Sequence, residues 1–178
     1  MKNEFPVLHT ERFDLRQFVD ADVENVFSGL SHPDVIKYYG VSYNSLEETK
    51  KQMTWFANLE KEGTGIWWAV CSNIDGKFIG AIGLNDLTKE HRKAEIGFWL
   101  LPENWGKGVM TEMMPMVLNY SFNNINLHRI EAYVDPENQN CKRALAKFNF
   151  ILEGTMRDCE IKNGRFRSWD VFAILSDK

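Results

Sequence analysis

The sequence predicts a mixed α/β (α+β) fold of about seven strands and about four helices, in one domain that spans residues 1–178. Two hairpin signals support paired strands, because Asp75-Gly76 and Asn163-Gly164 each separate two apolar runs. A capping box of Ser45 and Glu48 opens a helical pattern. A chain of this length buries roughly 70% of its unfolded surface, which is enough to form a core.

Apolar–polar alternation and capping signals predict the elements of the N-terminal half. These are a strand over residues 12–18, a helix over 21–30 with Asp20 as its N-cap, a helix from Ser45 to about Gly63, and two strands over 66–72 and 78–84. His32-Pro33 ends the first helix, because proline cannot continue the helical hydrogen bonding. Residues 35–43 are rich in aromatic side chains and fit no regular element.

The C-terminal half begins with the apolar run 96–101, which predicts a mostly buried strand with Glu95 at its head and Pro102 at its end. The further elements are predicted as a helix over 108–122, a strand over 129–134, a short helix over 141–148, and two strands over 153–161 and 165–175. Pro115 lies inside the first of these helices, where it removes one backbone hydrogen bond and is expected to kink or strain the helix.

The order of strand, glycine turn and helix start around Gly106-Lys107-Gly108 predicts a site for a phosphate group. Glycine lets the backbone approach a ligand, and the first N–H groups of a helix have no partner within the helix. Two common phosphate motifs do not fit. A dinucleotide fingerprint needs a third glycine where Thr111 stands, and a Walker loop needs Lys-Ser/Thr where Val109 follows the glycine. A nucleotide-binding protein is therefore disfavoured.

The longer stretch from Ala94 to Glu112, AEIGFWLLPENWGKGVMTE, resembles the cofactor-binding motif of the GNAT superfamily of N-acetyltransferases. That motif, Gln/Arg-x-x-Gly-x-Gly/Ala, falls on residues 105–110, and Gly108 matches its central glycine. Trp105 replaces Gln/Arg, and Met110 replaces Gly/Ala, where its side chain would stand close to a pyrophosphate. The run Trp-Gly-Lys-Gly-x-Met-Thr-Glu is familiar from one branch, the ribosomal-protein-alanine acetyltransferases and their relatives.

A second block, over residues 127–154, resembles the same family. There, a strand is followed by Asn, a Ser three residues on, then Glu-Lys-Leu-Gly-Phe and Glu-Gly. The corresponding residues of this chain are Asn138, Cys141 in place of Ser, the run 145–150, and Glu153-Gly154. The resemblance covers most of the chain and implies the GNAT fold, with a mixed and mostly antiparallel sheet.

The resemblance also implies transfer of an acetyl group from acetyl-CoA to a primary amine by direct attack. The acceptor is expected to be a protein N-terminal amine or a small amine. Polyamine or aminoglycoside acetylation, and a non-catalytic acyl-CoA-binding module, are the alternatives. The expected cofactor contacts are Trp99, Leu100 and Leu101 along the pantetheine arm, Trp105, Gly106, Lys107, Gly108, Val109 and Met110 around the pyrophosphate, and Asn138 as a polar contact.

Three residues are candidates for catalysis. Glu95 lies on the strand that the family uses to hold pantetheine, and a carboxylate there serves as base in parts of the superfamily; the alternative is an ion pair with Lys93 or Arg92. Glu160 stands where the ribosomal branch places a carboxylate near the acceptor, and otherwise is a solvated strand end. Cys141 replaces a Ser that the branch uses as the acid, and otherwise is a small buried hydrophobe. Glu95 is narrowly favoured as the base.

Aromatic side chains offer walls for an acceptor site. The candidates are Tyr38, Tyr39, Tyr43, Trp67 and Trp68. For the two tryptophans a place in the core is the preferred interpretation.

Composition limits the remaining possibilities. The net charge is −4 and is spread along the chain, so nucleic acid is not an expected partner, and no apolar run reaches the roughly 20 residues of a membrane span. Cys71, Cys141 and Cys159 are far apart and odd in number, which favours a reducing cytoplasm. The scattered cysteines and histidines predict no metal site. A monomer and a homodimer both remain open.

Overall fold

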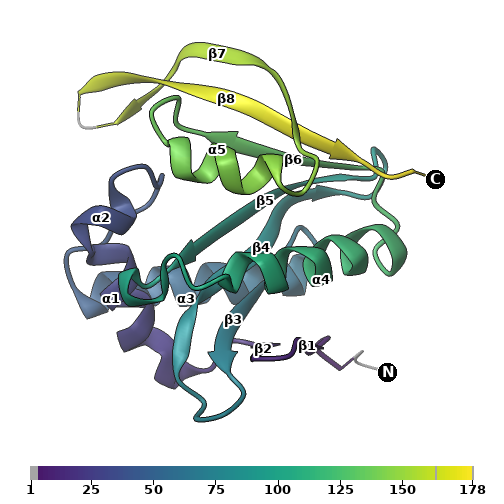
Figure 1. The fold of residues 1–178 in the computed structure, drawn as a ribbon. Helices are drawn as coiled ribbons and strands as arrows, with labels where there is room; N and C mark the ends of the chain where they lie inside the picture. The colour runs from purple at the N-terminus through teal and green to yellow at the C-terminus, as the bar shows by residue number, and fades with distance from the viewer. Residues whose placement is uncertain (1–3, 163, 178) are drawn as a thin grey trace.

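The fold is that of a computed structural model in which residues 4–162 and 164–177 are described. Its centre is an eight-stranded sheet with the order β1-β2-β3-β4-β5-β6-β8-β7 (Figure 1). The strands are β1 (Leu8–His9), β2 (Phe13–Arg16), β3 (Ile66–Ser72), β4 (Phe78–Thr88), β5 (Lys93–Leu100), β6 (Arg129–Val134), β7 (Ile151–Lys162) and β8 (Arg165–Leu175). The helices are α1 (Val23–Ser31), α2 (Pro33–Ile36), α3 (Leu46–Glu62), α4 (Val109–Asn123) and α5 (Gln139–Ala146), with short 3-10 turns at Asp20–Asp22 and Pro102–Asn104.

The sheet is antiparallel except where β5 meets β6. These two strands run parallel and pair at Lys93 with Arg129, Ala94 with Ile130, and Glu95 with Glu131. Beyond Glu95 the two strands diverge, and β6 continues with β8 and β7 while β5 stays with β4 (Figure 1). The remainder of β5 therefore presents one backbone edge toward the gap between the two halves of the sheet.

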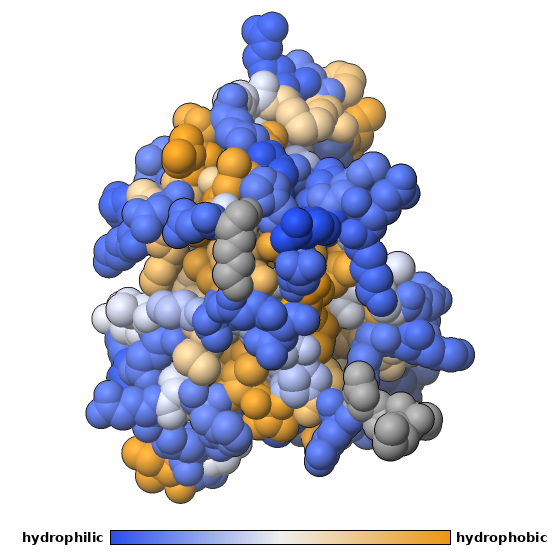
Figure 2. Space-filling model, turned by 90° about the vertical axis from the view of Figure 1, so that its right-hand side faces the viewer, coloured by the Kyte–Doolittle hydropathy of each residue, from blue (hydrophilic) through white to orange (hydrophobic). Residues whose placement is uncertain are grey.

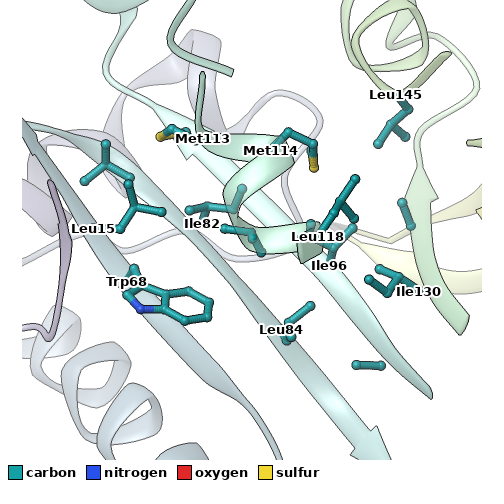
Figure 3. Packing of buried hydrophobic residues seen from close by; sticks show 14 of the residues in the cluster. Leu15, Trp68, Ile82, Leu84, Ile96, Met113, Met114, Leu118, Ile130 and Leu145 are labelled. Atoms are coloured by element: carbon teal, nitrogen blue, oxygen red, sulfur yellow. The ribbon is translucent and has the colours of Figure 1, made fainter. Parts of the chain in front are cut away.

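Two apolar clusters cover the two faces of the sheet. On one face, α4 places Met113, Met114 and Leu118 over strand residues such as Ile82 and Ile96 (Figure 3). On the other face, buried apolar residues of α1, α2 and α3 pack on alternate residues of the strands. The helix residues include Val26, Leu30, Val35, Phe56 and Leu59, and the strand residues include Trp67, Ala81 and Trp99. Successive strand residues point to opposite faces, so each central strand supplies both clusters.

Strand β7 forms one edge of the sheet, and most of its residues are exposed. The upper end of the molecule in Figure 2, where this hairpin lies, shows apolar side chains among charged ones. The exposed apolar residues of β7 and β8 are Ile151, Leu152, Met156, Ile161, Phe166 and Leu175. A register shift between Met156 and Glu160 and the charged residues around it interrupt this edge, which discourages uncontrolled strand pairing.

Several predicted elements are confirmed. The strands over 66–72, 129–134 and 165–175 have the expected bounds. Ser45 caps α3, because its hydroxyl accepts the N–H of Glu48 at 3.2 Å, and Gly63 ends this helix with φ 69°. Trp67 and Trp68 lie in the core, with 4% and 0% of their surface exposed.

The N-terminal region differs from the prediction. Asp20 is not the N-cap of a helix over 21–30, because residues 20–22 form a 3-10 turn and the α-helix begins only at Val23. The carboxylate of Asp22 accepts two hydrogen bonds from Arg16, at 2.7 and 2.8 Å, and one from the N–H of Val19. The ion pair of Arg16 with the buried Asp22, rather than a cap by Asp20, therefore holds this turn.

Further differences are smaller. The short strand β1 and the helix α2, which begins at Pro33, were not expected, and β4 continues to Thr88. Pro115 lies on the exposed side of α4, which remains one helix from Val109 to Asn123. At an exposed position, solvent can bond the carbonyl that proline leaves without a partner. Asn163, the first residue of the second predicted hairpin turn, lies outside the described residues, although β7 and β8 pair up to Lys162 with Arg165.

Candidate active site

The glycine loop stands directly before α4. Gly106 and Gly108 have φ values of 71° and 75°, in a region that L side chains rarely adopt, and Gly108 is the N-cap of α4. The first N–H groups of an α-helix lack acceptors within the helix and suit an anion. Lys107 is exposed in this loop, and its carbonyl accepts a hydrogen bond of 3.1 Å from Arg12. The loop therefore has the backbone conformation and the positive charge that a pyrophosphate requires.

Arg12 fixes the loop to the start of the chain. Its guanidinium forms an ion pair with Glu112 in the first turn of α4, and Thr10 donates to the same carboxylate at 3.1 Å. Arg12 Nη2 also lies 3.5 Å from the point that a Cβ on Gly108 would occupy. Arg12 is thus a residue at the site that the motifs did not reveal, because it lies about a hundred residues away in the sequence.

Trp105 and Met110, the two residues that differ from the family motif, each have defined contacts in the structure. The indole N–H of Trp105 donates to the carbonyl of Leu100 at 2.9 Å, so this side chain ties the loop to β5. Met110 is partly buried and packs against the core under α4. Because its side chain contacts the core, the structure does not support the expectation that Met110 stands close to a pyrophosphate. Val109 is likewise buried.

The three residues expected along the pantetheine arm are buried. Trp99, Leu100 and Leu101 have 4%, 9% and 8% of their surface exposed. Their side chains belong to the two apolar clusters, and the indole of Trp99 lies against Gly29. Any contact of these residues with a pantetheine arm would therefore come from the backbone edge of β5, which faces the gap toward β6.

Glu95 lies where β5 and β6 begin to diverge, in a cavity of about 300 Å³. The cavity is lined by Asp86, Thr88, Lys93, Glu95, Glu131 and Tyr133. Burial, then the charges of Asp86 and Glu131, raise the pKa of Glu95 to about 7. The alternative role of Glu95, an ion pair with Lys93 or Arg92, is absent among the described residues, since Lys93 pairs with Glu131 and Arg92 bonds Asn126.

Tyr39, in the loop after α2, lies near enough to Glu95 to feel its charge. Burial and the charge of Glu95 raise the pKa of the Tyr39 phenol, so this group stays protonated at neutral pH. Lys162, at the tip of the β7–β8 hairpin, donates to the carbonyl of Tyr39. The hairpin and the loop after α2 are therefore joined across the gap between the two halves of the sheet.

Glu160 does not line the cavity of Glu95. It lies on β7 opposite Arg167, and its carboxylate accepts the indole N–H of Trp169 at 2.9 Å. The guanidinium of Arg167 stacks on the same indole at 4.5 Å. Glu160 thus has a defined partner and is not merely a solvated strand end.

Asn138 and Cys141 belong to the start of α5. The side-chain oxygen of Asn138 accepts the N–H of Cys141 at 3.1 Å and caps this helix. Burial raises the pKa of the Cys141 thiol to about 12, and this residue packs against the core. The thiol therefore remains neutral at physiological pH and can act only as a hydrogen-bond donor or a weak acid.

The glycine loop before α4, the divergence of β5 and β6 and the buried carboxyl group of Glu95 are the arrangement that the sequence predicts for a CoA-dependent acyltransferase. Residues 12–151 match the model of a protein family described as "Acetyltransferase (GNAT) domain". The chain belongs to this family, and the enzyme uses acetyl-CoA as co-substrate.

One relative and two solved structures illustrate this membership. The uncharacterized N-acetyltransferase YoaA of Bacillus subtilis is 35% identical over 175 residues, which cover 98% of this chain and 99% of YoaA. RimL, a ribosomal L7/L12 alpha-N-protein acetyltransferase in complex with CoA, superposes with a TM-score of 0.86 at 20% identity and covers 97% and 99% of the two chains. Spermidine N-acetyltransferase of Vibrio cholerae, with CoA and spermine, gives 0.80 at 24% identity over 92% and 95%. The two structures show a common fold.

The described residues include neither a membrane-spanning helix nor a metal-binding group of side chains. None of their helices combines the length and apolarity needed to cross a membrane. Within residues 4–162 and 164–177, no group of three or more His, Cys, Asp or Glu side chains is arranged to hold a metal ion.

Proposed function

We propose that residues 1–178 form one N-acetyltransferase domain in which Glu95 is the base that receives the proton of the acceptor amine. Acetyl-CoA supplies the acetyl group as a thioester. The observation that carries the proposal is the position of Glu95, at the divergence of β5 and β6 and inside a cavity of about 300 Å³. A carboxyl group with a pKa of about 7 is matched to proton transfer near neutral pH.

One group of residues binds the co-substrate, and a second group takes part in the transfer of protons. The loop 105–110 and the start of α4 hold the pyrophosphate through backbone N–H groups, with Lys107 and Arg12 nearby. Backbone groups of residues 99–101 and the amide of Asn138 position the remainder of the co-substrate. Glu95 takes the proton that the amine loses as the N–C bond forms, and the thiol of Cys141 donates a hydrogen bond to the departing sulfur.

The acceptor is a protein N-terminal amine or a small amine. An α-amino group has a pKa of about 7.7–8.0, so a large fraction is neutral near pH 7.5, whereas a lysine amine is near 10.4. A base with a pKa of about 7 is sufficient for the first kind of acceptor. The likeness to RimL agrees with this choice, although at 20% identity it concerns the fold alone.

A second candidate is acetylation of a polyamine. The cavity of Glu95 holds three carboxylates, from Asp86, Glu95 and Glu131, and one lysine, Lys93. Lys93 and Arg129 pair with Glu131, so Asp86 and Glu95 are the acidic groups left to attract an acceptor with more than one ammonium group. A spermidine N(1)-acetyltransferase of Escherichia coli is 31% identical over 94 residues, 53% of this chain.

The test is release of free CoA thiol with an acceptor panel of peptides, polyamines and aminoglycosides. We expect amine-dependent thiol release, and Glu95→Gln should lower turnover by about 10²–10⁴-fold near pH 7. Glu90→Gln, in the exposed turn between β4 and β5, is the control and should keep the rate. Binding of acetyl-CoA without thiol release in the presence of any of these amines would support the acyl-CoA-binding module instead. A fully active Glu95→Gln enzyme would remove Glu95 from the mechanism.

A further inference from the structure

An irregularity in β4 brings Asp86 to the cavity of Glu95. The two strands β4 and β5 pair regularly from Gly80 with Leu100 to Asn85 with Glu95, and the register then shifts before Thr88. Side chains alternate along a regular strand, so only Asn85 should share the face of Glu95. Asp86 has φ 50°, and its side chain lines the cavity together with Glu95. A bulge of this kind redirects a side chain.

The titratable groups around Glu95 come from four elements. Besides Asp86 on β4, the charged groups are Lys93 on β5 and Glu131 on β6, and two neutral phenols, Tyr133 on β6 and Tyr39 in the loop after α2, complete the set. Glu131 is neutralised twice, by Arg129 at 2.6 Å and by Lys93 at 3.6 Å. Among the described residues the carboxylate of Asp86 has no ion-pair partner, and it accepts a hydrogen bond from the amide of Asn85 at 3.4 Å. Asp86 is thus the carboxylate beside Glu95 whose charge is not cancelled.

We propose that Asp86 is a positioning residue that acts through Glu95: the bulge aims its negative charge into the cavity and makes Glu95 a stronger proton acceptor during acetyl transfer. This inference rests on the proposed role of Glu95 as the base. Asp86 itself does not touch the reacting atoms.

The direction in which the pKa of Glu95 is shifted agrees with the position of Asp86. Burial raises the pKa of Glu95 most, the charge of Asp86 raises it further, Glu131 adds to this, and hydrogen bonding by Asn85 opposes it. Asp86 is itself exposed, so water screens part of its field. Removal of its charge should therefore lower the titration midpoint of Glu95 by a moderate amount, about 0.5 pH units.

The direct test is titration of the Glu95 carboxyl by ¹³C NMR in the whole protein and in Asp86→Asn. Asparagine tolerates the positive φ of this position and keeps the shape of the side chain, so the variant should fold. The resonance is assigned by its loss in Glu95→Gln. We expect a lower midpoint in Asp86→Asn, a difference that shrinks in about 0.5 M salt, and no change in the control Glu90→Gln. An unchanged midpoint in folded Asp86→Asn would overturn the inference.

The second readout is the pH profile of turnover from pH 5 to 9 with saturating acetyl-CoA. In Asp86→Asn the acidic limb of the profile should shift to lower pH by the same amount as the NMR midpoint. The rate at high pH should fall by a few fold, because the base is weaker. If the midpoint moves and the acidic limb does not, Glu95 is not the base, and both proposals fail. If Glu95→Gln abolishes the limb while Asp86→Asn leaves both readouts unchanged, the base stands and only the role of Asp86 is refuted.

Discussion

The indole N–H of Trp105 donates to the carbonyl of Leu100 at 2.9 Å, so the loop before α4 is bonded back to the last residue of β5. The two segments expected to hold the two ends of the co-substrate are thereby fixed to each other. In the family motif a Gln or Arg occupies the position of Trp105. The indole keeps a donor there and adds an apolar surface, although 45% of Trp105 is exposed.

Trp105→Phe should weaken the binding of acetyl-CoA by about 3–10-fold, because it removes one hydrogen bond worth about 1 kcal/mol and loosens the loop. Isothermal calorimetry measures this change. Trp55→Phe, at a partly exposed position on α3, is the matched control. If both variants bind equally well, the bond between Trp105 and Leu100 does not position the loop.

Gly108→Val should weaken acetyl-CoA binding at least tenfold, about 1.4 kcal/mol, because φ at this N-cap is 75° and a side chain would stand at the phosphate position. Gly76→Val is a control with the same kind of strain, since Gly76 has φ 70° in the β3–β4 turn. Calorimetric affinity that falls equally in both variants would indicate a general loss of stability rather than a phosphate site.

Glu160→Gln should change turnover by less than threefold between pH 6 and 9, because glutamine still accepts the indole N–H of Trp169 and Glu95 is the proposed base. Glu160→Ala should instead destabilise the hairpin by about 1 kcal/mol through loss of that bond. A Glu160→Gln enzyme that loses turnover mainly at low pH, beside an unchanged Glu95→Gln profile, would transfer the role of base to Glu160.

Cys141→Ala should lower kcat by about tenfold and affect the affinity for acetyl-CoA less, because the neutral thiol is proposed to donate to the leaving sulfur only as it departs. Full proton transfer from a thiol with a pKa of about 12 is unfavourable, so the effect should stay modest. Cys141→Ser, which retains a donor, should recover part of the rate. Wild-type turnover in the Ala variant would make Cys141 a packing residue.

Glu95→Gln should stabilise the fold at pH 8. The pKa of Glu95 rises from 4.5 to about 7 on folding, so its contribution to stability is present in full below pH 4.5 and is lost as the pH rises through 7. Glutamine does not titrate, and the variant should exceed the parent by on the order of 1–2 kcal/mol at pH 8, with a smaller difference at pH 5. Urea unfolding at both values measures this, and a difference that is independent of pH would contradict the raised pKa.

Local signals in the sequence were sufficient for most elements of the fold. The N-cap at Ser45, the turn at Asp75-Gly76 and the alternating strand over 129–134 depend on contacts between residues a few positions apart. The family motif around Gly108 likewise lies in one continuous stretch, and its backbone conformation follows from glycine itself. These features were therefore accessible before any tertiary contact was known.

The surroundings of the candidate base were decided by tertiary structure. The bulge that directs Asp86 toward Glu95 arises where the register between β4 and β5 shifts. No local sequence pattern predicted this bulge. The surroundings of Glu95 include Glu131 and Tyr133 of β6 and Tyr39 in the loop after α2, which come from distant parts of the chain. Sequence alone determined which residues carry carboxylates, thiols and glycines. Their proton affinities depend on desolvation and on neighbouring charges, which exist only after the strands have paired.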